Sequence, residues 1–130
     1  MDPFVETVVE LLGVALGEAR ARPMFGGYGL YHRGMMVALV DDGRLYLKAD
    51  AESQPAFRDA GSTPFLYERA GKPITLSYWE APPGALDSAD ELYPWAELAR
   101  EAARRAAFRQ PGRTKNRPGN IQAGSNGRTV

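Results

Sequence analysis

The sequence predicts an α+β fold, a two-layer sandwich in which helices cover one face of an antiparallel sheet. Helical apolar spacing occurs near both ends of the chain, at residues 4–16 and 95–106. Between these segments lie short apolar and aromatic runs separated by turn residues, which is typical of strands joined by hairpins. Because the strands come in runs, the sheet is expected to be antiparallel. A chain of 130 residues has the size of one domain with one core.

The first helix is predicted from its cap and its apolar stripe. Asp2 is expected to cap it, Pro3 suits its first turn, and Glu6 complements the helix dipole. Apolar residues then recur at helical spacing over 4–16. The helix is therefore expected to end near Gly17, with its stripe in the core.

Four strands are predicted between residues 20 and 50. Their segments read ARPMF, GLYH, MMVALV and RLYLKA. Asp42-Gly43 joins the last two segments, and Arg33-Gly34 joins the middle two. Glycine supplies the positive φ that a two-residue type I′ turn requires, so these strands are expected to form an antiparallel meander.

A short helix and two further strands are predicted next. The segment at 51–61 has helix-forming residues and a closing glycine, and Pro55 keeps this helix short. Strands are expected at PFLYER (64–69) and PITLSYWEA (73–81), with the turn at Gly71-Lys72.

The last predicted element is a long helix. Ser88 and Glu91 have the form of a capping box. Pro94 lies too deep for a helix that starts at Ser88, so the helix proper is expected from about Pro94. The predicted order is therefore α-β-β-β-β-α-β-β-α.

The basic residues gather at the end of the chain. Residues 1–99 contain 8 basic and 15 acidic residues, whereas residues 100–130 contain 8 basic and 1 acidic residue. From Pro111 onward the sequence lacks periodicity and is rich in Gly, Asn and Pro. We expect a domain over residues 1–108 and a flexible basic tail over residues 109–130. This tail is expected to meet an anionic partner, or else to help solubility or lie against the protein's own acidic surface.

Composition excludes several classes of protein. The chain has no cysteine, which excludes disulfides, thiolate metal sites and cysteine nucleophiles. Its first residues lack the basic region of a signal peptide, and no apolar run approaches the roughly 20 residues of a membrane span. A cytoplasmic protein without membrane contact is the expectation.

The stretch MFGGYGLYHRG (24–34) has the glycine content of a phosphate-binding loop without its chemistry. Met35 and Met36 follow Gly34, where such a loop has a lysine and a hydroxyl, and His32 takes the place of a dinucleotide-motif glycine. No cofactor is predicted. The glycines are interpreted as structural turn glycines, namely Gly26, Gly27, Gly29, Gly34 and Gly43.

His32 is the single histidine, which excludes a histidine metal cluster. On a hairpin it is interpreted as a surface residue. Nothing in the sequence places a nucleophile and an orienting carboxylate beside it, so no catalytic residue and no metal ligand is predicted.

Two binding surfaces are candidates. The first is a sheet face carrying basic and tyrosine residues, namely Arg22, Lys48, Tyr67 and Tyr78, although core or cross-strand packing is the favoured explanation of strand aromatics. The second is a contact for a partner or nucleic acid through the basic end, formed by Arg100, Arg104, Arg105, Arg109, Arg113, Lys115 and Arg117.

The phrases RPMFGGYGLYHRG, RLYLKAD and PFLYERAGKPITLSYWEAP occur in this order, followed by PWAELAREAA. Together they resemble the N-terminal domain family of TfoX (Sxy), which is named for regulators of natural competence. The resemblance covers about residues 4–106. It implies an α+β fold like that of secretion chaperones. The full-length regulators carry a second, helical C-terminal domain, whereas here a short basic tail follows the long helix, so a single-domain member is expected.

The resemblance also implies a cytoplasmic, non-enzymatic regulatory role. Competence regulators of this type are thought to act with the cyclic-AMP receptor protein, so the implied partner is a protein of the transcription machinery. Two alternatives remain beside this regulatory or protein-binding module. One is a nucleic-acid-binding protein, and the other is a small ligand-binding domain or enzyme. The sequence is compatible with a monomer or a homodimer.

Overall fold

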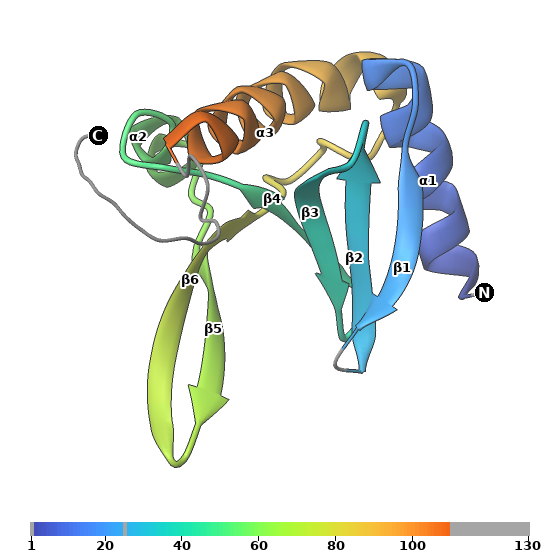
Figure 1. Ribbon diagram of the computed structural model, residues 1–130. Coiled ribbons are helices and arrows are strands. Elements are labelled where there is room, and N and C mark those ends of the chain that lie inside the picture. The colour runs from blue at the N-terminus through green and yellow to red at the C-terminus, as the bar shows by residue number, and fades with distance from the viewer. Residues whose placement is uncertain (1, 25, 110–130) are drawn as a thin grey trace.

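Six antiparallel strands form one sheet, and three helices lie on one side of it (Figure 1). The computed structural model describes residues 2–24 and 26–109. The elements follow one another as one helix, four strands, a helix, two strands and a helix. The predicted α+β class and element order are confirmed.

The helices are α1 (Pro3–Leu16), α2 (Gln54–Asp59) and α3 (Ala89–Arg109). The strands are β1 (Arg20–Met24), β2 (Gly27–His32), β3 (Met35–Asp41), β4 (Arg44–Lys48), β5 (Pro64–Arg69) and β6 (Lys72–Glu80). The strand order is β1-β2-β3-β4-β6-β5. The β5–β6 hairpin therefore joins the meander through β6 and projects away from its other strands (Figure 1).

Helix α1 has the caps that its sequence predicts. Asp2 Oδ1 accepts hydrogen bonds from the backbone N–H groups of Phe4 (2.7 Å) and Val5 (3.4 Å). Gly17 has φ +99° and donates its N–H to the carbonyl oxygen of Gly13 at 2.8 Å. The left-handed cap explains why the helix stops here.

The β2–β3, β3–β4 and β5–β6 hairpins close with pairs of residues at positive φ, which is the geometry of type I′ turns. Arg33 and Gly34 have φ +49° and +83°, and Asp42 and Gly43 have φ +54° and +71°. The β5–β6 turn lies at Ala70-Gly71, one residue before the predicted Gly71-Lys72. The reason for this correction is that Lys72 already pairs with Arg69 in the ladder.

Helix α3 corrects the prediction that the helix proper starts at Pro94. It begins at Ala89, because Ser88 Oγ accepts the Glu91 N–H at 3.1 Å and the Ser88 carbonyl accepts the Leu92 N–H at 3.0 Å. Leu92 is fully buried and anchors this first turn. Pro94 removes one hydrogen bond near the helix start, and the capped turn before it stays helical.

The core lies between the helices and the sheet. Its largest fully buried side chains include Leu12 of α1, Leu30 and Leu47 of the sheet and Phe57 of α2. The buried face of α3 is alanine apart from Leu92, so small side chains let this helix pack against β3 and β4.

His32 is buried, which corrects its interpretation as a surface residue. Its side chain is on the helix-covered face of β2, and its Nδ1 lies 2.8 Å from the carbonyl oxygen of Glu18. The carbonyl can only accept, so Nδ1 carries the hydrogen. Glu18 also accepts the backbone N–H of Arg33 at 2.8 Å through its carboxylate. These two hydrogen bonds hold the segment after α1 against the β2–β3 turn, and the segment covers the His32 imidazole.

Candidate functional site

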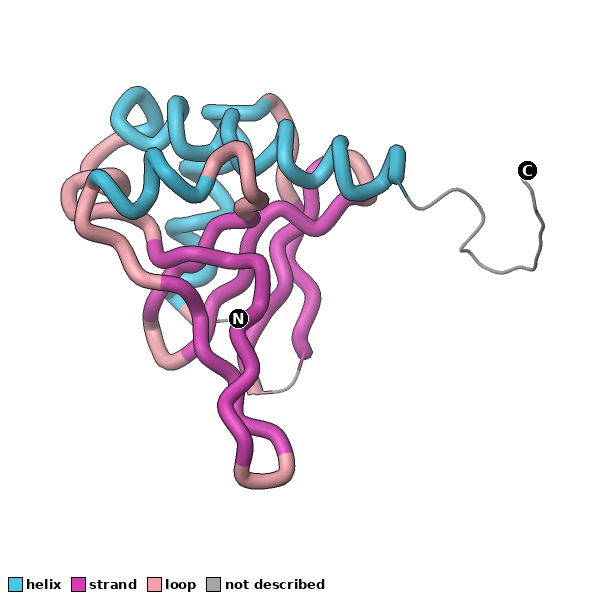
Figure 2. The backbone as a smooth tube through the Cα atoms, turned by 90° about the vertical axis from the view of Figure 1, so that its left-hand side faces the viewer, coloured by secondary structure: helices cyan, strands magenta, loops and turns pink. Residues whose placement is uncertain are grey.

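The face of the sheet turned away from the helices is the candidate site, and we call it the open face. Figure 2 shows the helices gathered on one side of the strands. Side chains alternate along β4 and β6, so Leu47 and its partner Trp79 face the core. Lys48 and its partner Tyr78 consequently point to the open face, as Tyr46 does.

Two cations on the open face lie over tyrosine rings. The guanidinium of Arg22 is 5.3 Å from the ring centroid of Tyr31, and the Lys48 ammonium is 5.1 Å from that of Tyr78. Met36 pairs with Tyr31 across β2 and β3. We call Arg22, Tyr31, Met36, Lys48 and Tyr78 the tyrosine row. It runs across the strands and takes one residue from each of β1, β2, β3, β4 and β6.

The tyrosine row is partly withdrawn from water. Burial raises the pKa of Tyr78 to about 12, and the phenol of Tyr31 adds to this rise. Burial also lowers the pKa of the Lys48 ammonium, while the Asp50 carboxylate opposes the change. The Lys48 ammonium donates a hydrogen bond to Ser77 Oγ at 3.1 Å. The row therefore holds a partly desolvated cation beside the Tyr78 phenol, which stays neutral far above neutral pH.

Apolar side chains fill the space around the row. A Cβ built at Gly29 would lie 3.0 Å from Met24 Sδ and 3.3 Å from Met36 Cε, so both methionines lean over this glycine. Leu39 is on the same face and is only 4% exposed. Methionine side chains adapt readily to the shape of a partner, so this surface suits binding.

Some basic side chains on the open face form ion pairs with carboxylates, and others do not. Arg44 forms an ion pair with Glu80 at 3.0 Å, and Arg20 forms one with Glu18 at 3.1 Å. Among residues 2–24 and 26–109, Arg22 and Lys48 have no carboxylate partner within 4.0 Å. The open face therefore presents two cations whose charge no neighbouring ion pair balances.

The structure brings together three of the four predicted sheet-face residues. Arg22, Lys48 and Tyr78 share the tyrosine row, whereas Tyr67 pairs with Ile74 in the part of the β5–β6 hairpin beyond the pairing with β4. Sequence reasoning did not select Met36. A β-bulge between Leu30 and Tyr31 shifts the register, so simple alternation could not have aligned Met36 with the row.

The predicted basic surface on α3 is largely neutralised. Arg105 contacts Asp50 at 2.7 and 3.0 Å and Glu52 at 3.3 Å. Arg104 pairs with Glu101 at 3.3 Å, and Arg100 pairs with Glu97. These carboxylates offset the charge that would attract nucleic acid.

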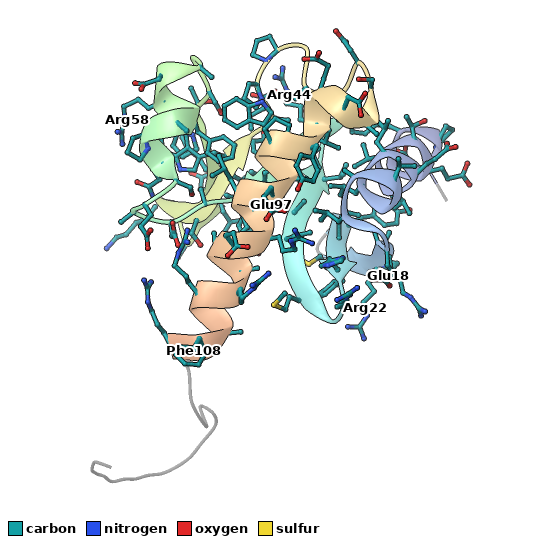
Figure 3. The ribbon with its side chains drawn as sticks, turned by 90° about the horizontal axis from the view of Figure 1, so that it is seen from above. Glu18, Arg22, Arg44, Arg58, Glu97 and Phe108 are labelled. Atoms are coloured by element: carbon teal, nitrogen blue, oxygen red, sulfur yellow. The ribbon has the colours of Figure 1, made fainter. Side chains whose placement is uncertain are left out.

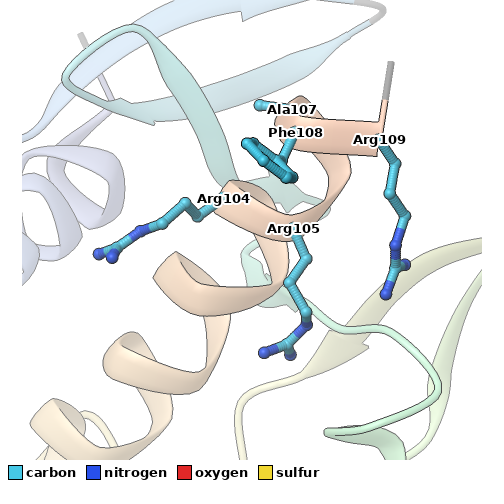
Figure 4. Close-up of a pocket in the computed structure, with 5 residues that line it drawn as sticks. All are labelled: Arg104, Arg105, Ala107, Phe108 and Arg109. Carbon is cyan, nitrogen blue, oxygen red and sulfur yellow. The ribbon is translucent and has the colours of Figure 1, made fainter. Parts of the chain in front are cut away.

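The end of α3 borders a hollow of about 570 Å³, where the side chains of Arg105 and Arg109 extend to one side of the helix and that of Arg104 extends to another (Figure 4). Phe108 also lines it and is 88% exposed. The other predicted basic contacts, Arg113, Lys115 and Arg117, lie outside the described residues, as does the predicted tail beyond Arg109.

The glycines act on the backbone in two ways. Gly26, Gly34 and Gly43 have φ between +71° and +83°. Gly27 has no such φ, but a Cβ there would lie 2.2 Å from the carbonyl oxygen of Val40. Gly29 underlies the methionines of the open face. These positions join or form strands, so none faces a helix N-terminus that could hold a phosphate.

A family model for the TfoX N-terminal domain matches residues 10–103. The chain belongs to this family. The matched residues of this TfoX N-terminal domain include the whole sheet and the tyrosine row. Arg104, Arg105 and Arg109 lie beyond the matched residues.

The TfoX domain also resembles the DNA transformation protein TfoX1 of Aliivibrio fischeri. The two chains are 35% identical over 65 residues, which cover 50% of this chain and 31% of that protein. The match therefore spans about a third of the relative's length.

Within the part of the chain that the structure describes, none of the helices combines the length and apolar character needed to cross a membrane. The same residues bring together no group of three or more His, Cys, Asp or Glu side chains suited to a metal ion.

Proposed function

We propose that this chain is a non-enzymatic regulatory module of the cytoplasm that acts by binding another protein on its open face. The observation that carries the proposal is the tyrosine row. It combines Met36 and two tyrosines with the cations of Arg22 and Lys48, on a sheet face that none of the described helices covers. Aromatic residues, methionine and arginine are enriched where proteins bind one another.

The chemistry of the row favours binding over catalysis. A catalytic phenol needs a pKa close to the working pH, and burial moves the pKa of Tyr78 to about 12. His32, the residue type most often used as a general base, donates to the Glu18 carbonyl on the opposite face of the sheet. Neither the Tyr78 phenol nor the His32 imidazole is therefore suited to transfer a proton on the open face.

We further propose that the bound protein belongs to the transcription machinery. The support is membership of the TfoX N-terminal domain family and the similarity to a DNA transformation protein. The ion pairs of Arg100, Arg104 and Arg105 favour a protein over a nucleic acid as the direct partner of the described residues.

The experiment is affinity purification of the tagged full-length chain from its native cell, with and without nuclease. Recovered material is scored for RNA polymerase, the cyclic-AMP receptor protein and nucleic acid. The proposal expects one of these proteins to be recovered even after nuclease treatment. Recovery of nucleic acid alone, or of no transcription protein, would refute it.

A further inference from the structure

We infer that the tyrosine row binds an acidic segment of the partner, an extended stretch in which carboxylates are interspersed with apolar side chains. This inference rests on the proposed function and names the class of partner for the same face. It follows from the charge of the row, the positions of its rings and its direction across the sheet.

The positive charge of the tyrosine row favours carboxylates in the segment that it binds. Arg20 and Arg44 on the open face already have Glu18 and Glu80 as ion-pair partners. Arg22 and Lys48 lie over rings instead, and Lys48 donates to the neutral hydroxyl of Ser77, with the Asp50 carboxylate acting on it beyond ion-pair distance. A partner carboxylate would give each of them a counter-charge, and at Lys48 it would also compensate for the hydration that burial removes.

The ring positions favour a peptide over single-stranded nucleic acid. Bases bind such proteins by stacking on free aromatic faces. In the row, the cation of Arg22 lies over the Tyr31 ring and that of Lys48 over the Tyr78 ring. The Tyr46 ring makes an edge contact with Phe65, with 4.8 Å between centroids. Because these rings already contact a cation or another ring, they are less free to stack on bases. Met36 and the ring edges can instead make apolar contacts with the side chains of a peptide.

The direction of the row sets the spacing of the acids. Arg22 is on β1 and Lys48 on β4, three strand steps apart. With about 4.8 Å between neighbouring strands, the backbones that carry the two cations are roughly 14 Å apart along the sheet. An extended chain advances about 3.3 Å per residue, so carboxylates about four residues apart would reach both cations.

The test uses the full-length chain and a labelled peptide, Ser-Glu-Ser-Leu-Ser-Glu-Ser, whose glutamates are four residues apart and whose leucine lies on the same side of an extended chain. Fluorescence anisotropy measures its affinity. We expect Arg22→Gln and Lys48→Gln each to weaken binding by about fivefold, a common size for loss of one charge contact. Lys48→Arg should restore most of the affinity, and a peptide with glutamine for glutamate should bind far more weakly.

Arg58→Gln is the matched control. Arg58 also lies over an aromatic ring, that of Trp79 at 5.6 Å, but it belongs to α2 on the helix-covered side. Arg58 and Arg22 lie on opposite sides of the molecule (Figure 3). We expect Arg58→Gln to leave the affinity unchanged, and thermal unfolding of each variant checks that its fold is intact.

Any of three results would overturn the inference. The glutamine peptide could bind as tightly as the glutamate peptide, or the Arg22→Gln/Lys48→Gln variant could bind the glutamate peptide as tightly as the wild type does. A single-stranded oligonucleotide could also bind the row more tightly than the glutamate peptide does. If such a result comes with nuclease-resistant recovery of a transcription protein from cells, the acidic-segment inference fails while the proposed function stands. If the peptide binds as expected but no transcription protein is recovered, the proposed function fails instead.

Discussion

The Arg105 guanidinium donates two hydrogen bonds to the Asp50 carboxylate, with Nε 2.7 Å from Oδ2 and Nη2 3.0 Å from Oδ1. Asp50 follows β4, and Arg105 lies in the last turns of α3, so the contact ties the end of the long helix to the sheet. The backbone N–H groups of Glu52 and Ser53 also donate to Asp50. The Arg105 hydrogen bonds are the main reason why the pKa of Asp50 lies below its usual 3.8.

Asp50→Asn should lower the free energy of unfolding at neutral pH by about 1–2 kcal/mol, the usual range for a charge-assisted hydrogen bond. Because the folded-state pKa is depressed, this stabilisation is complete above the unfolded pKa and is lost as pH falls through the folded one. Denaturant unfolding at several pH values should therefore show the two proteins converging well below pH 3.8.

Glu101→Gln is the control for this prediction. Glu101 pairs with Arg104 at 3.3 Å, and the Arg104 side chain is 60% exposed. Its loss should change stability by less than about 0.5 kcal/mol. Equal stability of the wild type and Asp50→Asn at neutral pH would contradict the structural role of the contact.

Gly27→Ala should destabilise the protein by about 2 kcal/mol or more, because the new Cβ would lie 2.2 Å from the backbone carbonyl oxygen of Val40. Gly13→Ala should instead stabilise it by about 0.5–1 kcal/mol. Gly13 is inside α1 and has nothing within 4 Å of the added methyl group. Thermal unfolding distinguishes the two, and similar melting temperatures would show that β2 and β3 do not approach closely at Gly27.

Tyr78 should ionise near pH 12, well above the usual 10 for a phenol. Its folded-state pKa is raised, so the stability that it contributes is present below about pH 10 and is lost as pH rises through the folded value. The difference between ultraviolet titrations of the wild type and Tyr78→Phe isolates this phenol. A difference curve centred at pH 10 would mean that Tyr78 is not buried in the row.

His32→Ala should cost about 2–3 kcal/mol of unfolding free energy. The substitution leaves the Glu18 carbonyl without its donor and opens a cavity in the core. Denaturant unfolding measures the loss. A change below about 0.5 kcal/mol, as expected for a surface residue, would contradict the buried position.

Local patterns were enough to predict the elements of the fold. Asp2 and Gly17 delimit α1 as expected, and the Asp42-Gly43 turn marks the β3–β4 hairpin. The error at Pro94 arose because the rule against proline inside helices ignores what a capped first turn and a buried Leu92 contribute. Tertiary packing decided that boundary.

The candidate site was less predictable. Arg22, Lys48 and Tyr78 could be selected by residue type, but their alignment depends on the pairing of β4 with β6 and on the bulge at Tyr31. The burial of His32 depends on a contact with Glu18, 14 positions earlier in the chain. The neutralisation of Arg105 depends on Asp50, 55 positions away. Such distant contacts leave no periodic signal in the sequence.

The central claim is that the open face binds a transcription protein, and site-specific photo-crosslinking in the native cell tests it most directly. A photoreactive amino acid is placed at Met36 in the tyrosine row, and separately at Val14 of α1, which is 71% exposed. We predict a covalent adduct with RNA polymerase or the cyclic-AMP receptor protein from position 36 and none from position 14. An adduct with either protein from position 14 alone, or equally from both positions, would contradict the claim.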